Sequence, residues 1–210
     1  PLHHKVYLRR NGPEPMDTRV TTARLLSYVF QPVLTSTYLL AFVSFTRAPS
    51  FSSALGWFLL SAALSAGLPA LFIFLLLRRG SITDFQVRLR QQRLQPLLVA
   101  LACAGVALLV SHALEAPREL TLTIASGLLP GACLTAVTPF WKISFHTATL
   151  AGALAVILWL NGPWALAGLP VLGAVGWSRV SLGRHTCAQV LAGAAAGGLG
   201  AAAVLLTAGI

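Results

Sequence analysis

Long runs of uncharged, mostly apolar residues divide this chain, and they constrain its fold more than any other feature. The runs 25–46, 48–77, 94–114 and 120–141 contain no formal charge. Each is long enough to cross a bilayer as one helix, which takes about 20 residues. A further run extends from residue 185 to residue 210. Because the bilayer core offers the backbone no hydrogen-bond partner, runs of this kind fold as helices.

The interval 143–178 is too long for one span, and a turn signal, Asn161-Gly162-Pro163, lies near its middle. We expect two short helices there. The sequence therefore predicts an all-α, polytopic transmembrane helical bundle of about six or seven spans. Its organisation would be a flexible basic tail, 1–24, followed by one integral membrane domain, 25–210.

Two of these helices carry further signals. The first apolar run is long and no cleavage-site pattern follows it, so we expect it to be retained rather than removed as a signal peptide. The last run contains the small-residue stretch 192–200, rich in Ala and Gly. Such a surface lets another helix come close, so we expect this helix to pack inside the bundle.

Carboxylates are scarce, since the chain has only five Asp and Glu residues among 210. This scarcity argues against an Asp-rich metal cluster, a paired-carboxylate hydrolase site and an acidic proton relay. The three cysteines lie in apolar surroundings without C-x-x-C spacing, which argues against a zinc site or a disulfide framework. We expect no metal and no cofactor.

Lys and Arg are distributed unevenly between the two sides of the predicted bundle. The tail, the loop 78–93, the turn around Lys142 and the segment 179–184 should share one side. That side holds 13 of the 15 Lys and Arg residues, the exceptions being Arg47 and Arg118. The positive-inside rule makes it cytoplasmic, in what we expect to be a prokaryotic cell membrane. Anionic lipid head groups account for the +10 charge, so it predicts no nucleic-acid partner, and the sequence does not indicate an oligomeric state.

Two histidines, His146 and His185, stand where a polar loop enters an apolar helix on this cationic side. A helix N-terminus favours a phosphate group, and nearby Arg or Lys adds charge-assisted contacts. A single histidine at such a place is more often an interface or capping residue. Two of them can divide phosphoryl transfer, one attacking phosphorus and the other protonating the leaving oxygen, with fixed cations in place of a metal.

The residues around both histidines form a pattern. The segment Ser178-Arg179-Val180-Ser181-Leu182-Gly183-Arg184-His185, followed four residues later by Gln189, resembles the signature SRxxxxxHxxxD of the type 2 phosphatidic acid phosphatase superfamily. Gln189 stands where the family has Asp. Ser144 and His146 match the signature PSGH, with Ile143 and Phe145 in place of its Pro and Gly. The stretch from Arg88 to Pro96 loosely matches KxxxxxxRP, so the resemblance covers about 84–200.

The resemblance implies a metal-independent membrane phosphatase. In it His185 would be the nucleophile that forms a phosphohistidine, and His146 the acid that protonates the leaving group. Gln189, one turn along the helix, would orient the ring of His185 in place of the family's Asp. The phosphoryl oxygens would be held by Arg179, by a hydrogen bond from Ser144, and by one or two of Arg88, Arg90 and Arg93.

Arg93 is the favoured choice among the three loop arginines, because Arg90, Arg93 and Pro96 keep an even spacing into the third span. Lys142 has no counterpart in the signatures. It either substitutes for the family's lysine or anchors its helix at the interface.

The predicted substrate is a lipid phosphate or diphosphate with a small head, such as phosphatidate or an isoprenyl phosphate, whose tail stays among the membrane lipids. The alternative is a non-catalytic relative that binds or transports a phospholipid. Gln189 and the altered second signature keep that alternative open.

Overall fold

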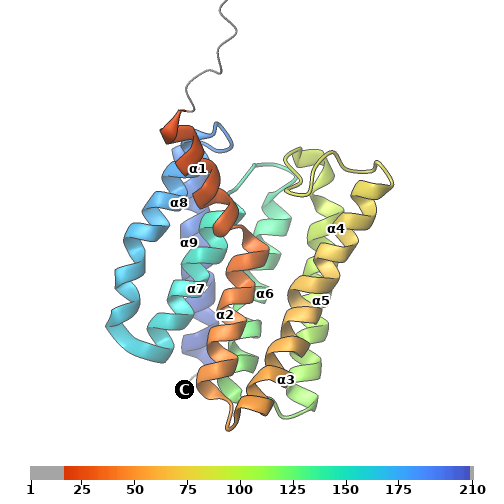
Figure 1. Ribbon diagram of the computed structural model, residues 1–210, viewed down its shortest axis with the longest axis vertical. Coiled ribbons are helices and arrows are strands. Elements are labelled where there is room, and N and C mark those ends of the chain that lie inside the picture. The colour runs from red at the N-terminus through yellow and green to blue at the C-terminus, as the bar shows by residue number, and fades with distance from the viewer. Residues whose placement is uncertain (1–16, 209–210) are drawn as a thin grey trace, which may run out of the picture.

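The computed structural model describes residues 17–208, and their regular elements are all helical (Figure 1). This confirms the predicted fold class. The α-helices are α1 (Thr18–Val29), α2 (Pro32–Arg47), α3 (Phe51–Ala62), α4 (Leu68–Arg78), α5 (Leu94–Ala113), α6 (Arg118–Val137), α7 (Phe145–Asn161), α8 (Leu169–Ser181) and α9 (Cys187–Ala208). A π-helical turn, η1 (Ala63–Gly67), joins α3 to α4, and the short 3-10 helices are η2 (Arg90–Gln92) and η3 (Gly162–Gly168).

Five helical stretches are long and apolar enough to cross a membrane, and the bent pair α1 and α2 would be a sixth. One of the five, Phe145–Ser181, contains both α7 and α8. These two helices run in opposite directions on either side of η3 (Figure 1). The turn begins at Gly162, whose φ of 73° suits a residue without a Cβ. The predicted pair of short helices is therefore confirmed.

The start of the domain differs from the prediction. Residues 18–24, expected in a flexible tail, form the first part of α1, and residues 25–29 complete that helix. The side chain of Asp17 accepts the N–H of Arg19 and so caps α1. Pro32 disfavours a helical conformation in the residue before it, and the chain bends by 51° between α1 and α2. The rest of the predicted tail, 1–16, lies outside the described residues.

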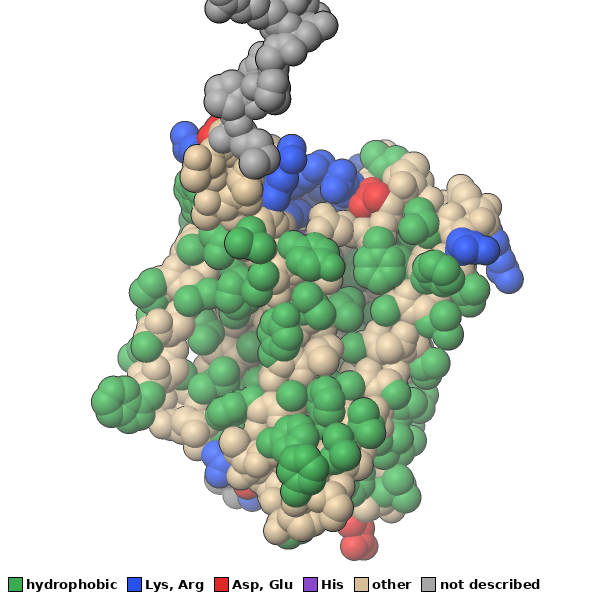
Figure 2. All heavy atoms as spheres, in the orientation of Figure 1, with side chains coloured by type: hydrophobic (Ala, Val, Ile, Leu, Met, Phe, Trp, Pro, Cys, Tyr) green, Lys and Arg blue, Asp and Glu red, His purple; other side chains and the backbone are tan. Residues whose placement is uncertain are grey.

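Helix α1 and the connections 79–93, 138–144 and 182–186 lie at one end of the bundle, and 48–50, 114–117 and η3 lie at the other (Figure 1). Figure 2 shows Lys and Arg side chains gathered at the first end, with uncharged flanks below it. Of the Lys and Arg within residues 17–208, only Arg47 and Arg118 belong to the opposite end. The expected grouping of the cationic loops at one end is confirmed.

Helices α7 and α9 touch through their backbones. A Cβ added at Gly193 would overlap the carbonyl oxygen of Ser144, and one at Gly197 would overlap that of Ala148. The N–H of Ser144 also donates to the carbonyl of Gln189, at 3.2 Å. The small-residue face of the last helix therefore packs as predicted, and it fixes the start of α7 against the start of α9.

Candidate active site

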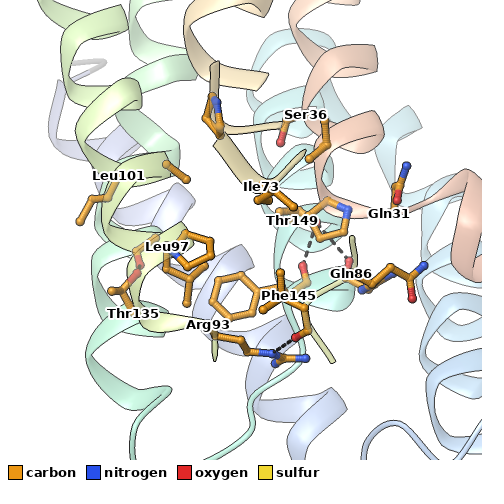
Figure 3. Close-up of a pocket in the computed structure, with 18 of the residues that line it drawn as sticks. Gln31, Ser36, Ile73, Gln86, Arg93, Leu97, Leu101, Thr135, Phe145 and Thr149 are labelled. Atoms are coloured by element: carbon orange, nitrogen blue, oxygen red, sulfur yellow. Dashed lines mark hydrogen bonds between the residues drawn. The ribbon is translucent and has the colours of Figure 1, made fainter. Parts of the chain in front are cut away.

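A cavity of about 290 Å³ opens between α2, α4, α5, α6 and α7 at the cationic end of the bundle (Figure 3). Four of the residues singled out in the sequence line it: Arg93, His146, Arg179 and His185. They come from the start of α5, the first turn of α7, the end of α8 and the loop before α9. The fold thus brings together side chains that are up to 92 positions apart in the chain, from Arg93 to His185.

Positive charge is in excess around this cavity. The side chain of Lys142 has a lowered pKa, because it is partly buried and because Arg93, Arg179 and Arg184 repel its charge. Asp84 supplies the one ion pair found among residues 17–208, to Arg88 at 3.5 Å. Several Lys and Arg side chains therefore lie close together near the cavity, with only one carboxylate, Asp84, among them. A bound anion would reduce the repulsion between these cations.

Arg179 is the most buried of these cations, with 4% of its surface exposed. Its Nη1 donates to the hydroxyl of Ser27, while its Nε is buried and has no hydrogen-bond partner among the described residues. Burying a guanidinium N–H without a partner is costly. Arg179 also lines the cavity, and a guanidinium there suits the geometry of a phosphoryl group.

The ring of His185 is fixed by a backbone carbonyl. Its Nδ1 lies 3.0 Å from the carbonyl oxygen of Lys142, which can only accept, so Nδ1 carries the proton in the neutral ring. Nε2 then has a free lone pair. Burial, and next the charge of Arg179, lower the pKa of His185 to about 4. The ring is therefore neutral at pH 7, which is the form that can attack phosphorus.

His146 is held in the opposite tautomer. Its Nε2 lies 3.1 Å from the carbonyl oxygen of Ser27, so in the neutral ring Nε2 carries the proton and Nδ1 is the free nitrogen. Sequence reasoning missed Ser27, because it lies outside all three signatures. Asp17 followed by Thr18 was the available signal that a helix begins there.

The prediction that Gln189 orients His185 is wrong in its geometry. The side-chain oxygen of Gln189 accepts the N–H of Thr186 at 3.2 Å, and the Thr186 hydroxyl accepts the N–H of Gln189 at 3.3 Å. This reciprocal pair is a capping box. His185 precedes the cap of α9 and is not on the helix, so the i, i+4 relation does not apply to its side chain. The carbonyl of Lys142 holds the ring instead.

The structure separates the three loop arginines. Arg93 lines the cavity, with its Nε donating to the carbonyl of Val87 at 2.8 Å. Arg90 donates to the carbonyl of Phe140 at 2.8 Å, and Arg88 pairs with Asp84; neither lines the cavity. Arg93, the favoured choice, is therefore the one placed at the site.

Ser144 and Lys142, also predicted to bind phosphate, do not line the cavity. Ser144 is fully buried, and its hydroxyl has no partner within the described part of the chain. Lys142 contributes its carbonyl to His185, while its side chain is not part of the cavity lining.

An apolar groove continues from the charged end of the cavity. Leu97, Ala100, Leu101 and Ala104 follow Arg93 along α5, and Gly127 and Gly131 of α6 and Ile73 of α4 line the same cavity. Figure 3 labels Arg93, Leu97, Leu101 and Ile73 among these residues. At 1.5 Å per helical residue, the distance from Arg93 to Ala104 along α5 is about 16 Å. The groove therefore reaches about halfway across a hydrocarbon core.

Residues 17–208 contain no group of three or more His, Cys, Asp or Glu side chains that could hold a metal ion. No protein-family model, curated protein or solved structure matches the chain. The interpretation of the site therefore rests on its motif residues and on the geometry described above.

Proposed function

We propose that this protein hydrolyses a lipid phosphate or diphosphate without a metal ion, through a phosphohistidine on His185. One observation carries the proposal. Two buried histidines with opposite free nitrogens line one cavity together with Arg93 and the buried Arg179. That cavity continues into an apolar groove.

Each residue then has a defined part in the chemistry. Arg93 and Arg179 bind the phosphoryl oxygens. The Nε2 lone pair of His185 attacks phosphorus while the bond from phosphorus to the leaving oxygen breaks. His146 enters this step as its cation, with a second proton on Nδ1, and gives that proton to the leaving oxygen. In the second step His146 takes a proton from water, the water oxygen attacks the phosphohistidine, and phosphate leaves with His185 regenerated.

The substrate class follows from the two parts of the cavity. The cationic end suits a phosphate or diphosphate head, and the groove along α5 and α6 suits an acyl or isoprenoid tail. Phosphatidate and isoprenyl phosphates or diphosphates meet both conditions. The Lys and Arg bias further leads us to propose that this end faces the cytoplasm, as in a prokaryotic cell membrane. An impermeant thiol reagent should then fail to label Gln91→Cys in intact cells.

The test is phosphate release by the purified protein in detergent, with EDTA present, from a panel of lipid phosphates that differ in head and tail. Activity should survive chelation and disappear in His185→Asn. Loss of all activity with EDTA, restored by added metal, would contradict the mechanism.

The departures from the second and third signatures favour a second candidate, a protein that binds or moves a phospholipid without hydrolysing it. It predicts saturable binding of a lipid phosphate with no phosphate release. It also predicts that His185→Asn, which leaves Arg93 and Arg179 in place, binds the lipid as the parent does.

A further inference from the structure

Ser27, on α1, contacts two groups of the candidate site. It is 3% exposed, although α1 lies at the end of the bundle and its neighbours Leu25 and Tyr28 are 62% and 63% exposed. Helix α1 packs against α8, where Arg19 also lies over the ring of Trp177 at 5.9 Å. Ser27 therefore lies on the buried face of α1, with Ala23 one turn before it, and contacts the cavity residues directly.

The hydroxyl of Ser27 determines how Arg179 presents its guanidinium. It accepts from Nη1, at one end of the group, and so leaves Nε without a partner among the described residues. Nε and Nη2 form the edge of a guanidinium that binds two phosphate oxygens side by side. Ser27 binds Nη1 and takes neither of these two donors, and a shift of the guanidinium would expose the buried Nε to a phosphate.

The carbonyl of Ser27 acts on His146. By accepting from Nε2 it fixes the tautomer and the plane of the ring, and Nδ1 is left as the nitrogen that exchanges a proton with the leaving group or water. One residue therefore orients a phosphate-binding cation with its side chain and an acid–base group with its backbone.

We propose that Ser27 is a positioning residue of this site, and that α1 is thereby part of the phosphate-binding machinery. The inference rests on the proposed function and adds a residue that none of the three signatures contains. Its two contacts are separable, because Ser27→Ala removes the hydroxyl contact to Arg179 and keeps the carbonyl contact to His146.

The test measures binding of inorganic phosphate and of orthovanadate to the purified protein, from the rise in its unfolding temperature. Ser27→Ala should weaken phosphate binding about tenfold, since a hydrogen bond to a charged group is lost and Arg179 is no longer held. Ser27→Thr keeps a hydroxyl and should bind as the parent does. Ser61→Ala is the matched control, because Ser61 is 1% exposed but bonds only within its own helix, to the carbonyl of Trp57.

Two further readouts separate positioning from general stability. In an Arg179→Gln background, Ser27→Ala should weaken phosphate binding no further. With a lipid phosphate as substrate, Ser27→Ala should raise KM while the pH dependence of kcat is unchanged, because the carbonyl bond to His146 remains. If Ser27→Ala does not fold, Ser27→Cys, a weaker acceptor of similar size, replaces it.

Equal phosphate binding by the parent and Ser27→Ala would overturn the inference and leave the proposed function standing. A loss in Ser27→Ala that persists undiminished in the Arg179→Gln background would also overturn it. If the parent binds neither phosphate nor vanadate, the proposed function fails, and the role of Ser27 fails with it.

Discussion

The two sides of the cavity are built differently. On one side α7 and α9 pack backbone against backbone through Gly193 and Gly197. His146 in the first turn of α7 and His185 in the loop before α9 are each held in one tautomer by a carbonyl. On the other side a groove lies between α4 and α5, and Arg93 is at the end of the long connection 79–93. The groups proposed to react lie on the tightly packed side, and the proposed tail contacts lie on the open side.

This difference matches what each side would have to do. Phosphoryl transfer needs its nucleophile and its acid held in a fixed geometry, because small displacements are costly in rate. A lipid tail needs only apolar surface of sufficient length. The open side also contains the π-helical turn η1, between α3 and α4, and such turns are frequent at functional sites.

The largest effect should come from disrupting the packing of α7 against α9. Gly197→Leu places a side chain where the carbonyl of Ala148 lies, so α7 and α9 would have to separate. We expect loss of folded protein and of all activity. Gly105→Leu, on α5, is the matched control, because a Cβ there meets nothing within 4 Å. Folded protein should be recovered at the parent level from Gly105→Leu, as judged by size-exclusion chromatography; a stable Gly197→Leu would refute the packing.

The protonation of His185 tests the same side more finely. Because its pKa is lowered to about 4, the ring should lose reactivity only as the pH falls toward 4, and not near the ordinary value of about 6.5. At pH 5 the ring should still be mostly neutral and should react with an acylating reagent at close to its rate at pH 7. Mass spectrometry of the His185 peptide measures this, with exposed His112 as the reference for the reagent. A midpoint near 6.5 for His185 would show that its ring is not shielded.

Filling the groove tests the open side. Ala104→Phe should block the far end of the groove while Arg93 and both histidines keep their places. We expect KM for a long-tailed lipid phosphate to rise about tenfold, as several buried methylene groups lose their contacts, and KM for a short-tailed one to stay unchanged. Measurement of KM across a series of tail lengths checks this. Equal effects on all tail lengths would place the tail elsewhere.

The smallest effect should follow from Gln189→Ala. This change removes one half of the capping box of α9 and leaves the carbonyl that holds His185. The cost should be about 1 kcal/mol of stability, with kcat within about threefold of the parent. Thermal unfolding and steady-state kinetics check the two parts. A hundredfold fall in kcat would restore the orienting role first predicted for Gln189.

Much of the fold could be predicted because charge and turn residues are local signals. The uncharged runs gave the helices, and Asn161-Gly162-Pro163 gave the α7–α8 turn. The bend at Pro32 was missed because Arg24 was taken as the boundary of the membrane domain. In the structure that charge lies within α1, at the cationic end, where it does not interrupt a helix.

The site was predictable only where it depends on side-chain identity. Four of the predicted site residues line the cavity. Arg179 and His185 were predicted from their spacing, His146 from its position in the second signature, and Arg93 from its spacing to Pro96. The carbonyls of Ser27 and Lys142 were not predictable, since any residue type supplies a carbonyl. Gln189 was misassigned because the same Thr-x-x-Gln pattern that follows His185 also starts a helix.

Trapping the intermediate tests the central claim most directly. The protein, incubated with a ³²P-labelled lipid phosphate in EDTA and quenched in alkali to preserve phosphohistidine, should carry the label on the peptide that contains His185. His146→Ala should still accept label, about 10² to 10⁴ times more slowly, because the acid is missing but the nucleophile remains. His185→Ala should accept none. Phosphate release at the parent rate by His185→Ala, or label on another residue, would contradict the account.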